Sequence, residues 1–366
     1  MLLAVLLAAA AVGVWAEQRT RWGARLSAVV ITMGVTFALS NLSLIPVTAP
    51  VYDMVWTFLV PLAIPLLLFR ADLRRILREA GPTLLAFAIG GLGTAAGTVL
   101  AYHTVPLGEH GWQLAAIFSS TYIGGSMNYV AASEAVGLRS GDLLTAGVAA
   151  DNLVMALYFL LLFSLPSIGW LRRRYRRRPQ LEAGPEASAA PGAGDLDVLR
   201  LATALAVAAG LCAAGYGLAA WTGLDGTGIL FVTAMIVVLA TLLPGPLGRL
   251  AAAERVGMFL MQVFFAAIGA SANIGVVLRV GPLLFVFAGL ILLVHLLVLL
   301  AAGKLLRLDL AELVIASNAN MGGPTTAAAM AVARGWRSLV IPAVLCGTLG
   351  YAVATFAGVA LGLWLR

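Results

Sequence analysis

Twelve long apolar segments, separated by short breaks that hold most of the arginines, constrain this chain more than any other feature. They lie at about 1–16, 27–46, 51–69, 81–102, 112–136, 140–170, 198–221, 228–243, 256–272, 280–303, 310–333 and 338–365. Of the 366 residues 61% are hydrophobic and 11% are charged, whereas a soluble domain carries about 25% charged residues. A globule of this size needs a polar shell, and a spanning helix needs about 20 apolar residues. We therefore expect an all-α, polytopic membrane protein.

The net charge of +7 does not indicate nucleic-acid binding. The basic residues sit in short clusters between apolar segments, which is typical of loops on the cytoplasmic side of a membrane. We therefore expect the protein to contact membrane lipid and not to bind nucleic acid. Cys212 and Cys346 lie far apart in apolar segments, so neither a disulfide framework nor a metal site is indicated.

The two halves of the chain repeat each other at an offset of 198 residues. The matched pairs are Ser119 with Ser317, Gly124-Gly125 with Gly322-Gly323, Ala131 with Ala329, Ala135 with Ala333, Gly137 with Gly335, and Arg139-Ser140 with Arg337-Ser338. Gly81-Pro82 and Gly281-Pro282 are each predicted to open the helix before this region. Between the halves, six arginines are followed by a Pro/Gly/Ala/Glu stretch whose composition is that of a linker. The predicted organisation is a first repeat at 1–170, a linker at 171–197 and a second repeat at 198–366.

The distribution of basic residues decides between two topologies. If all twelve segments cross the membrane and residue 1 starts outside, 11 basic residues lie inside and 12 outside, which is no bias. If 112–136 and 310–333 are instead re-entrant hairpins, 20 lie inside and 3 outside. This version gives five crossings per half, so the repeats are inverted. It predicts both termini outside and a cytoplasmic linker, in the plasma or inner membrane. The charge count tests the first hairpin, whereas the second rests on the repeat.

The first candidate site is a double glycine inside an apolar segment. Gly-Gly disfavours a continuous helix and exposes backbone polar groups, which are tolerated at membrane depth only inside protein or beside a polar cavity. The polar neighbours of the glycines add donors and acceptors. The candidate substrate-binding residues are Thr121, Tyr122, Gly124, Gly125, Ser126 and Asn128. Close helix packing through small residues is the alternative interpretation.

The second candidate site is its counterpart in the other half. A proline directly after the glycines prevents a continuous helix and is favoured as the first residue of a new one. The start of that half-helix directs free N–H groups and a partial positive charge towards the break. The candidate residues are Asn318, Asn320, Gly322, Gly323, Pro324, Thr325 and Thr326. Two inverted half-helices facing each other form a site for an anionic or polar solute.

Asp151, followed by Asn152, lies inside the apolar segment 140–170. A carboxylate at this depth costs about 2.5–3.5 kcal/mol on insertion scales and marks a functional site by default. It can serve as a Na⁺ ligand, with Asn128 and Thr325 as further ligands, or as a proton carrier. A hydrogen-bonded structural role facing the second hairpin is the alternative. Glu134 either completes the ion site or reaches the aqueous end of its hairpin.

The search for enzyme motifs is negative. The chain contains no His-Glu-x-x-His, Gly-x-Ser-x-Gly, Walker or Cys-x-x-Cys pattern. We therefore predict neither catalysis nor a cofactor, and any transport must be secondary or passive. His295 stands alone in an apolar segment, where an interhelical hydrogen bond is its expected role.

Four runs of residues in this chain resemble the YjcL-type family, a largely uncharacterised family of integral membrane proteins of bacteria and plastids. The resemblance covers essentially the whole chain and is carried by the runs 61–78, 122–129, 150–152 and 318–330. It implies a relationship to bile-acid/sodium symporters and cation/proton antiporters, in which two inverted units form a panel and a mobile core. In those relatives the interrupted helices hold substrate and coupling ions and often span the membrane fully, so whether they span or re-enter here stays open.

The resemblance also implies a homodimer formed through the panel helices. One departure from the relatives is that no adjacent acidic pair of the proton-antiporter kind is present. The predicted function is a secondary transporter that moves a small organic anion, coupled to Na⁺ or H⁺, by an elevator-like motion. A passive channel and a non-transporting scaffold or subunit are the alternatives.

Overall fold

The computed structural model describes the whole chain except residues 22, 24–27, 176–196 and 224–226. Within the described residues every secondary-structure element is a helix, and eight helices are long and apolar enough to cross a membrane. Two shorter apolar helices, Ala28–Asn41 and Gly228–Leu242, accompany them. The predicted polytopic, all-helical fold is therefore confirmed. Most of the predicted linker, 171–197, lies outside the described residues.

The helices of the first half are α1 (Leu2–Arg19), α3 (Ala28–Asn41), α4 (Pro50–Met54), η1 (Val55–Leu59), α5 (Val60–Leu68), α6 (Leu73–Glu79), α7 (Gly81–Thr104), η2 (Gly108–His110), α8 (Gly111–Gly124), α9 (Met127–Ala135), α10 (Gly141–Ser164), η3 (Leu165–Ser167) and α11 (Gly169–Arg172). Those of the second half are α12 (Val198–Thr222), α13 (Gly228–Leu242), α14 (Pro244–Gly248), η5 (Ala251–Ala253), α15 (Glu254–Ala270), α16 (Ile274–Leu305), α17 (Leu310–Ala333), η6 (Arg337–Leu339) and α18 (Val340–Leu365).

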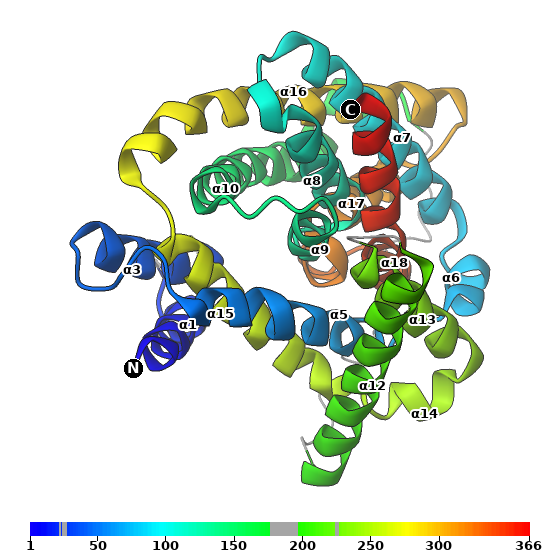
Figure 1. The fold of residues 1–366 in the computed structure, drawn as a ribbon. Coiled ribbons are helices and arrows are strands. Elements are labelled where there is room, and N and C mark those ends of the chain that lie inside the picture. The colour runs from blue at the N-terminus through cyan, green and yellow to red at the C-terminus, as the bar shows by residue number, and fades with distance from the viewer. Residues whose placement is uncertain (22, 24–27, 176–196, 224–226) are drawn as a thin grey trace.

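The long helices form two groups that pack mainly among themselves (Figure 1). The hairpin group contains α7, α8, α9, α10, α16, α17 and α18, with the interrupted segments at its centre. The flanking group contains α1, α3, α5, α12, α13 and α15. Each group draws helices from both halves of the chain. The panel-and-core arrangement, the inversion of the repeats and an elevator motion stay predictions.

The start of α16 corrects one expectation. Gly81-Pro82 opens α7 as predicted, but Gly281-Pro282 lies inside α16, which begins at Ile274. The Asn273 side chain accepts hydrogen bonds from the backbone N–H groups of Gly275 (2.9 Å) and Val276 (3.4 Å). This cap satisfies N–H groups of the first turn and starts the helix seven residues earlier than the Gly-Pro pair would.

The apolar segment 51–69 is interrupted by one wide turn. Val55–Leu59 form a π-helical turn between α4 and α5, directly before Pro61. Such turns occur mostly as single interruptions and often lie at functional sites. Trp56, in this turn, packs edge-on against Phe264 of α15 with ring centroids 4.7 Å apart. The turn therefore directs a large aromatic side chain into the flanking group.

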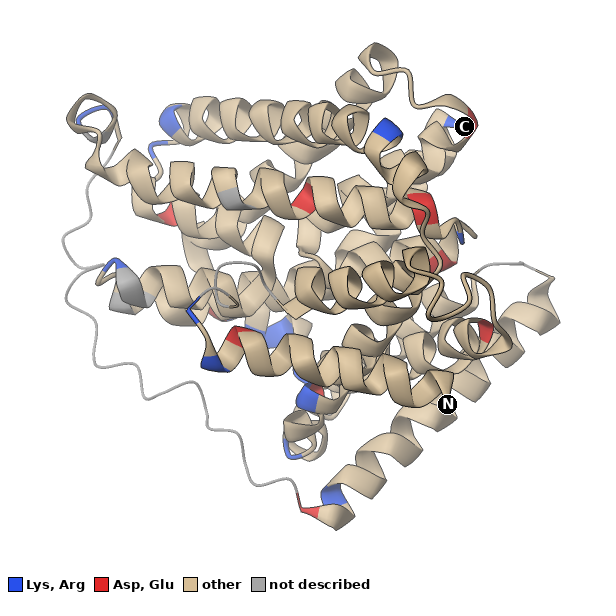
Figure 2. Cartoon of the chain, turned by 90° about the vertical axis from the view of Figure 1, so that its left-hand side faces the viewer, with Lys and Arg blue, Asp and Glu red and all other residues tan. Residues whose placement is uncertain are grey.

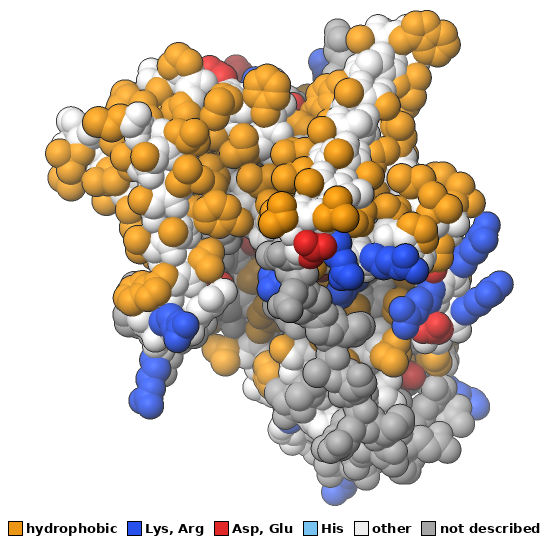
Figure 3. Space-filling view, turned by 90° about the horizontal axis from the view of Figure 1, so that it is seen from below, with side chains coloured by type: hydrophobic (Ala, Val, Ile, Leu, Met, Phe, Trp, Pro, Cys, Tyr) orange, Lys and Arg blue, Asp and Glu red, His pale blue; other side chains and the backbone are white. Residues whose placement is uncertain are grey.

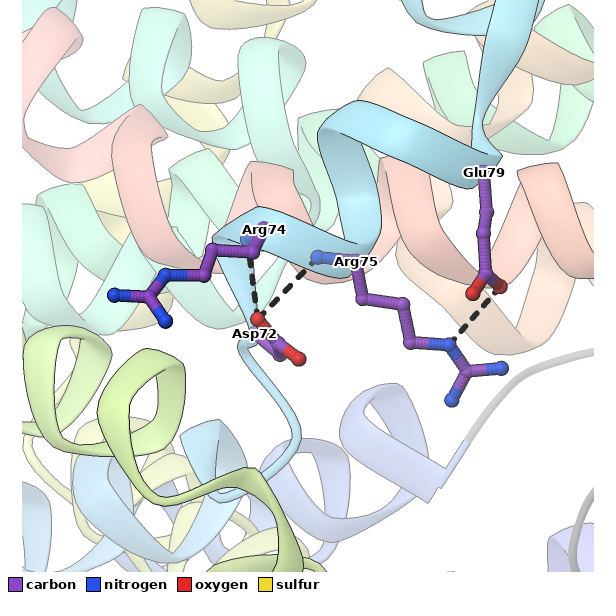
Figure 4. Close-up of polar contacts among 4 residues, drawn as sticks. All are labelled: Asp72, Arg74, Arg75 and Glu79. Carbon is purple, nitrogen blue, oxygen red and sulfur yellow. Dashed lines mark hydrogen bonds and ion pairs between the residues drawn. The ribbon is translucent and has the colours of Figure 1, made fainter.

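Helix α6 is a short amphipathic element beside the bundle. Asp72 caps it by accepting from the backbone N–H groups of Arg74 (3.0 Å) and Arg75 (3.3 Å), and Arg75 pairs with Glu79 at 3.0 Å (Figure 4). Ile76 is buried and holds the helix against the protein. Its exposed arginines suit a solvated face near anionic lipid headgroups.

The charge and hydrophobic patterns of the surface agree with a bilayer environment. Most of each helix carries no charged side chain (Figure 2). Hydrophobic side chains cover much of the helical surface seen from below, and several Lys and Arg side chains gather towards the right of that view (Figure 3). Trp221, Leu92 and Leu278 are 83%, 70% and 70% exposed. Large apolar side chains at such exposure are stable against hydrocarbon, whereas a monomeric soluble protein rarely exposes so wide an apolar surface.

Candidate functional site

The first interrupted segment folds back on itself as a hairpin. Helix α8 ends at Gly124, Gly125 has φ 92° and ψ 165°, and α9 begins at Met127. The side-chain amide of Gln113, near the start of α8, donates to the carbonyl of Val136, just past the end of α9, at 3.0 Å. Residues 23 positions apart in a straight helix would be about 35 Å apart. The open ends of both arms therefore lie together, as expected for a re-entrant hairpin.

The second interrupted segment also reverses. Helix α17 is broken at Gly323, where φ is 75° and ψ is −165°, and Pro324 opens its second arm. Across the break, Thr326 Oγ1 donates to Asn318 Oδ1 at 2.7 Å, and Asn318 Nδ2 lies 3.4 Å from Met330 Sδ. Twelve residues of straight helix span about 18 Å, which these two side chains could not bridge. The second arm therefore lies against the first.

The two reversals correspond at the offset of 198 residues. Gly125 and Gly323 have matching backbone conformations, and Gly137 and Gly335 at the open ends both have positive φ (67° and 73°). The closing turns match as well, since the N–H of Leu138 donates to the carbonyl of Ser133 at 3.0 Å and that of Trp336 to Ala331 at 2.9 Å. These local features support the repeat, while equivalence of the complete halves stays a prediction.

The tips of the hairpins touch each other at their glycines. A Cβ placed on Gly125 would lie 3.1 Å from the backbone nitrogen of Gly323 and 3.2 Å from its Cα. A Cβ on Gly323 would lie 2.6 Å from the hydroxyl of Tyr351, on α18. Both positions thus require glycine, because the backbone conformation is nearly inaccessible to other residues and because no room exists for a side chain.

Buried amides fix the tips in place. Asn128, 2% exposed, donates to the carbonyls of Gly124 (2.9 Å) and Gly350 (3.4 Å), and its own carbonyl oxygen accepts from Thr355 Oγ1 at 2.8 Å. From the other hairpin, Asn320 Nδ2 donates to the carbonyl of Ile123 at 2.9 Å. The bonds to Gly124 and Ile123 satisfy carbonyls next to the helix break, as a buried backbone requires, whereas those to Gly350 and Thr355 hold Asn128 against α18.

A second network ties the arms to their own helix group. His295 Nδ1 lies 2.8 Å from the Gly90 carbonyl, and its Nε2 lies 3.0 Å from Ser317 Oγ. The carbonyl can only accept, so Nδ1 carries a proton. Thr94 Oγ1 donates to the Tyr122 carbonyl at 2.9 Å. The expected interhelical hydrogen bond of His295 is therefore present.

The tips lie beside the flanking group. A cavity of about 10 Å³, roughly the size needed by one water molecule, separates hairpin α8–α9 from α5 and α13. Its lining comprises Ile64, Leu67, Leu68, Met127, Asn128, Ala131, Thr233, Tyr351 and Thr355. Apolar side chains predominate, with one amide and three hydroxyl groups among them. The boundary between the two helix groups thus passes directly next to the first tip.

The thirteen predicted substrate-binding residues all belong to the two hairpins but differ in access. Eight are buried: Thr121, Tyr122, Gly124, Gly125, Asn128, Asn318, Asn320 and Gly323. Gly322, Pro324 and Thr326 are half-buried, and Ser126 and Thr325 are exposed. The exposed pair follows the two reversals. A substrate-binding role for the thirteen residues stays a prediction.

Asp151 lies on α10 against hairpin α8–α9. Its Oδ1 atom and the hydroxyl of Tyr122 are buried without hydrogen-bond partners, and the two side chains interact with each other. No hydrogen bond recorded among the described residues joins Asp151 to Asn128 or Thr325, and the Na⁺ ligand set stays a prediction. Asn152 donates to the Val148 carbonyl of its own helix at 2.8 Å.

Glu134 lies at the open end of its hairpin. It pairs with Arg139 at 3.5 Å, and the guanidinium of Arg139 sits 5.6 Å from the ring centroid of Trp56 in the flanking group. No contact between Glu134 and Asp151 is recorded among the described residues. Its role, in an ion site or at the aqueous end of the hairpin, stays a prediction.

Sequence reasoning missed several residues of this region. Tyr351 and Thr355 are isolated polar side chains in the apolar helix α18, and nothing in their local sequence distinguishes them from packing residues. Asp309 and Glu312 are buried at the start of α17, where Asp309 accepts from the N–H of Ala311 at 2.8 Å and Glu312 accepts from that of Asp309 at 3.3 Å. Their Asp-x-x-Glu spacing resembles a capping box, a signal that could have been read from the sequence.

No three His, Cys, Asp or Glu side chains gather as a metal site in the described part of the chain.

Together, the apolar helices and the paired hairpins define a polytopic helical membrane protein. A family model described as a protein of unknown function (DUF819) matches residues 4–366. The uncharacterised membrane protein YjcL of Bacillus subtilis (strain 168) is 36% identical over 375 residues, which is 97% of this chain and 94% of that protein. The chain belongs to this family, as the resemblance implied.

Proposed function

We propose that this protein is a secondary active transporter that moves a small organic anion across the membrane by alternating access, coupled to Na⁺ or H⁺. The observation that supports this most is the meeting of two hairpin tips at Gly125 and Gly323, inside the protein and beside the boundary between two helix groups. Interrupted helices that meet in this way are the usual construction of solute sites in transporters with internal repeats.

The chemistry of the tips favours an anion. The second arm of each hairpin begins at its tip, at Met127 and at Pro324, so the partial positive charge of each helix start points into the tip region. The exposed hydroxyls of Ser126 and Thr325 add neutral donors. No acidic side chain is recorded among the residues lining the adjoining cavity. A carboxylate or similar oxyanion is the solute class that matches such donors.

The size of the cavity favours a carrier over an open channel. About 10 Å³ next to the first tip is too small for an organic anion, which typically needs hundreds of Å³. A solute can therefore reach this region only if the hairpin group and the flanking group move relative to each other. A motion that opens the boundary alternately to each side is the alternating access of a carrier.

The orientation belongs to the same proposal. The arginine distribution supports a plasma or inner membrane location with both termini outside and the segment 171–197 cytoplasmic. A homodimer through the flanking helices, and the absence of catalysis and of a cofactor, also stay predictions.

The test combines ligand binding with flux. Purified full-length protein is heated in detergent with acetate, pyruvate, succinate, citrate or glutamate, in Na⁺ or K⁺ buffer. A bound ligand at 100 times its Kd stabilises the folded state by about 2.7 kcal/mol. We expect at least one carboxylate to raise Tm and to show saturable counterflow in proteoliposomes. The exposed-site double variant Ser126→Ala/Thr325→Val should lose both effects, and Ser164→Ala, exposed at the end of α10, should retain them.

Three results would contradict the proposal. If no carboxylate raises Tm or exchanges, the organic-anion assignment is wrong. A flux that rises linearly without saturation or counterflow indicates a channel. Stable co-purification with another protein, without any flux, indicates a scaffold or subunit.

A further inference from the structure

Asp151, on α10, faces both arms of the first hairpin, α8 and α9. The hydroxyl of Tyr129, on α9, donates to the Leu144 carbonyl at 2.9 Å. The same hydroxyl lies against Gly147, one turn before Asp151, in the space that a Cβ on this glycine would occupy. Tyr122, on α8, reaches the carboxyl group itself. The ring of Phe118 fills the space between the tyrosines, with centroids 5.9 Å and 6.3 Å away. The carboxyl group is thus enclosed by aromatic rings.

Two polar atoms in this enclosure have no hydrogen-bond partner. They are Oδ1 of Asp151 and the hydroxyl oxygen of Tyr122. Asp151 is 6% exposed and Tyr122 is 0% exposed. Buried polar atoms are nearly always paired, so each exception points to a missing proton, water or ion. Here the two exceptions belong to side chains that interact with each other.

No positive charge is recorded beside Asp151 among the described residues. The titratable groups that interact with it are Tyr122 from α8 and Tyr129 from α9. On α16, His295 is already bonded to Gly90 and Ser317. On α15 and α17 the acidic side chains lie in the first turns, and the cavity between α10 and α16 is lined almost entirely by apolar side chains.

We propose, resting on the transport function above, that Asp151 and Tyr122 form a proton-binding site and that H⁺ is the coupling ion. A bare carboxylate cannot remain stable in such surroundings, because a buried charge needs a partner. Na⁺ would need several oxygen ligands at short range, and among the described residues the ionisable groups recorded beside this carboxyl are the two tyrosine hydroxyls of Tyr122 and Tyr129. One proton converts the carboxylate into a neutral acid, whose O–H can donate to the Tyr122 oxygen, and no other reactant is needed.

The site is connected to the hairpin tip through the backbone of α8. Tyr122 precedes Gly124 by two residues, and the carbonyl groups at 122 and 123 accept from Thr94 and Asn320. When the proton leaves, the Asp151 carboxylate is negatively charged and must contact water or a cation. Such contact requires α8 and α10 to separate locally. Because α8 carries the tip, the protonation state of Asp151 controls the position of the proposed solute site.

Infrared difference spectroscopy tests the site without a transport assay. Spectra of the purified full-length protein in lipid nanodiscs are recorded between acid and alkaline pH, and the probe is the proton alone. We expect a carbonyl stretching band of a protonated carboxylic acid at neutral pH, lost in Asp151→Asn and shifted in frequency in Tyr122→Phe. Glu134→Gln, which removes the acid paired with Arg139, should leave the band unchanged.

Two results would overturn the proton site. One is a spectrum at neutral pH that is identical in Asp151→Asn and the unmodified protein. The other is a carboxylate band that responds to Na⁺ but not to K⁺ and disappears in the same variant. Tyr122→Phe keeps the test valid if Asp151→Asn does not fold, because an unshifted band in that variant also contradicts the pair. If counterflow is observed but no band depends on Asp151, the transport function is supported and the proton site is contradicted. If the band is observed without counterflow, the proton site is supported and the transport function is contradicted.

Discussion

Replacement of Gly323 by alanine tests the hairpin contact most directly. This glycine has φ 75° and ψ −165°, and a Cβ there would lie 2.6 Å from the Tyr351 hydroxyl and 2.9 Å from two of its ring carbons. Backbone strain in this region costs about 1–3 kcal/mol for a residue other than glycine. Overpacking costs about 1–3 kcal/mol more. We therefore expect Gly323→Ala to destabilise the protein by about 2–6 kcal/mol, the sum of the two.

Two matched glycines separate the strain from the contact. Gly335 also has a positive φ, 73°, but a Cβ there meets nothing within 4 Å, so its alanine variant should lose only about 1–2 kcal/mol. Gly210 is helical and open, and its alanine variant should gain about 0.5–1 kcal/mol. The expected order of stability is Gly210→Ala, unmodified protein, Gly335→Ala, Gly323→Ala.

The assay is unfolding in detergent, followed by tryptophan fluorescence, with size-exclusion chromatography to confirm the folded state. Adding Tyr351→Phe to Gly323→Ala removes the atom nearest to the new methyl group. We expect the double variant to recover part of the loss, with a coupling energy of about 0.5–3 kcal/mol. The reasoning is refuted if Gly323→Ala is as stable as Gly335→Ala, because then Gly323 does not lie against Tyr351.

Three further predictions concern the first hairpin. Thr355→Val removes the hydroxyl that donates to Asn128 Oδ1 at 2.8 Å, and the unsatisfied acceptor should lower the free energy of unfolding by about 1–3 kcal/mol. Arg139→Gln removes a partly exposed ion pair and should change that free energy by less than about 1 kcal/mol in the same assay. Single cysteines placed at Glu109 and at Gly137 should react with a membrane-impermeant maleimide from the same side of the membrane, because the segment between them re-enters.

Each of these has its own control. Thr104→Val removes an exposed hydroxyl that bonds only within its own helix and should leave stability within about 0.5 kcal/mol, so an equal loss in both threonine variants would contradict the role of Asn128. A large loss in Arg139→Gln would mean that the open end of the hairpin carries more of the stability than its exposure suggests.

The cysteine experiment uses a background with Cys212 and Cys346 replaced by serine. Labelling from opposite sides would show a spanning broken helix.

The hairpins could be predicted because their signals are local. Gly-Gly within an apolar segment, and proline after the second pair, both act on the backbone where they stand. The distribution of arginines then reported on which segments cross the membrane. Gly125 and Gly323 were accordingly identified as the points of interruption, and the structure places the reversals there.

The partners of these residues could not be predicted, because they depend on packing between distant segments. Tyr351 covers both tips from a helix whose sequence gives no sign of it. Asp151 was expected to bind Na⁺, to carry a proton or to face the second hairpin, and its interaction with Tyr122 of the first hairpin could not be foreseen. The early start of α16 depends on a single side chain, Asn273, while the Gly-Pro pair seven residues on suggested a different boundary.

The contacts of the tips indicate which parts of the protein can move together. Backbone groups next to a helix break at membrane depth must find partners, and the Ile123 carbonyl of the first hairpin accepts from Asn320 of the second. The Asn128 side chain holds the first tip against Gly350 and Thr355 of α18. Separating the hairpins from each other or from α18 would break these bonds, at about 1–3 kcal/mol for each buried group left unpaired. The lining towards α5 and α13 is mostly apolar, so sliding there breaks few directional bonds. We therefore predict that any motion between the two helix groups carries both tips and α18 as one body past the flanking helices.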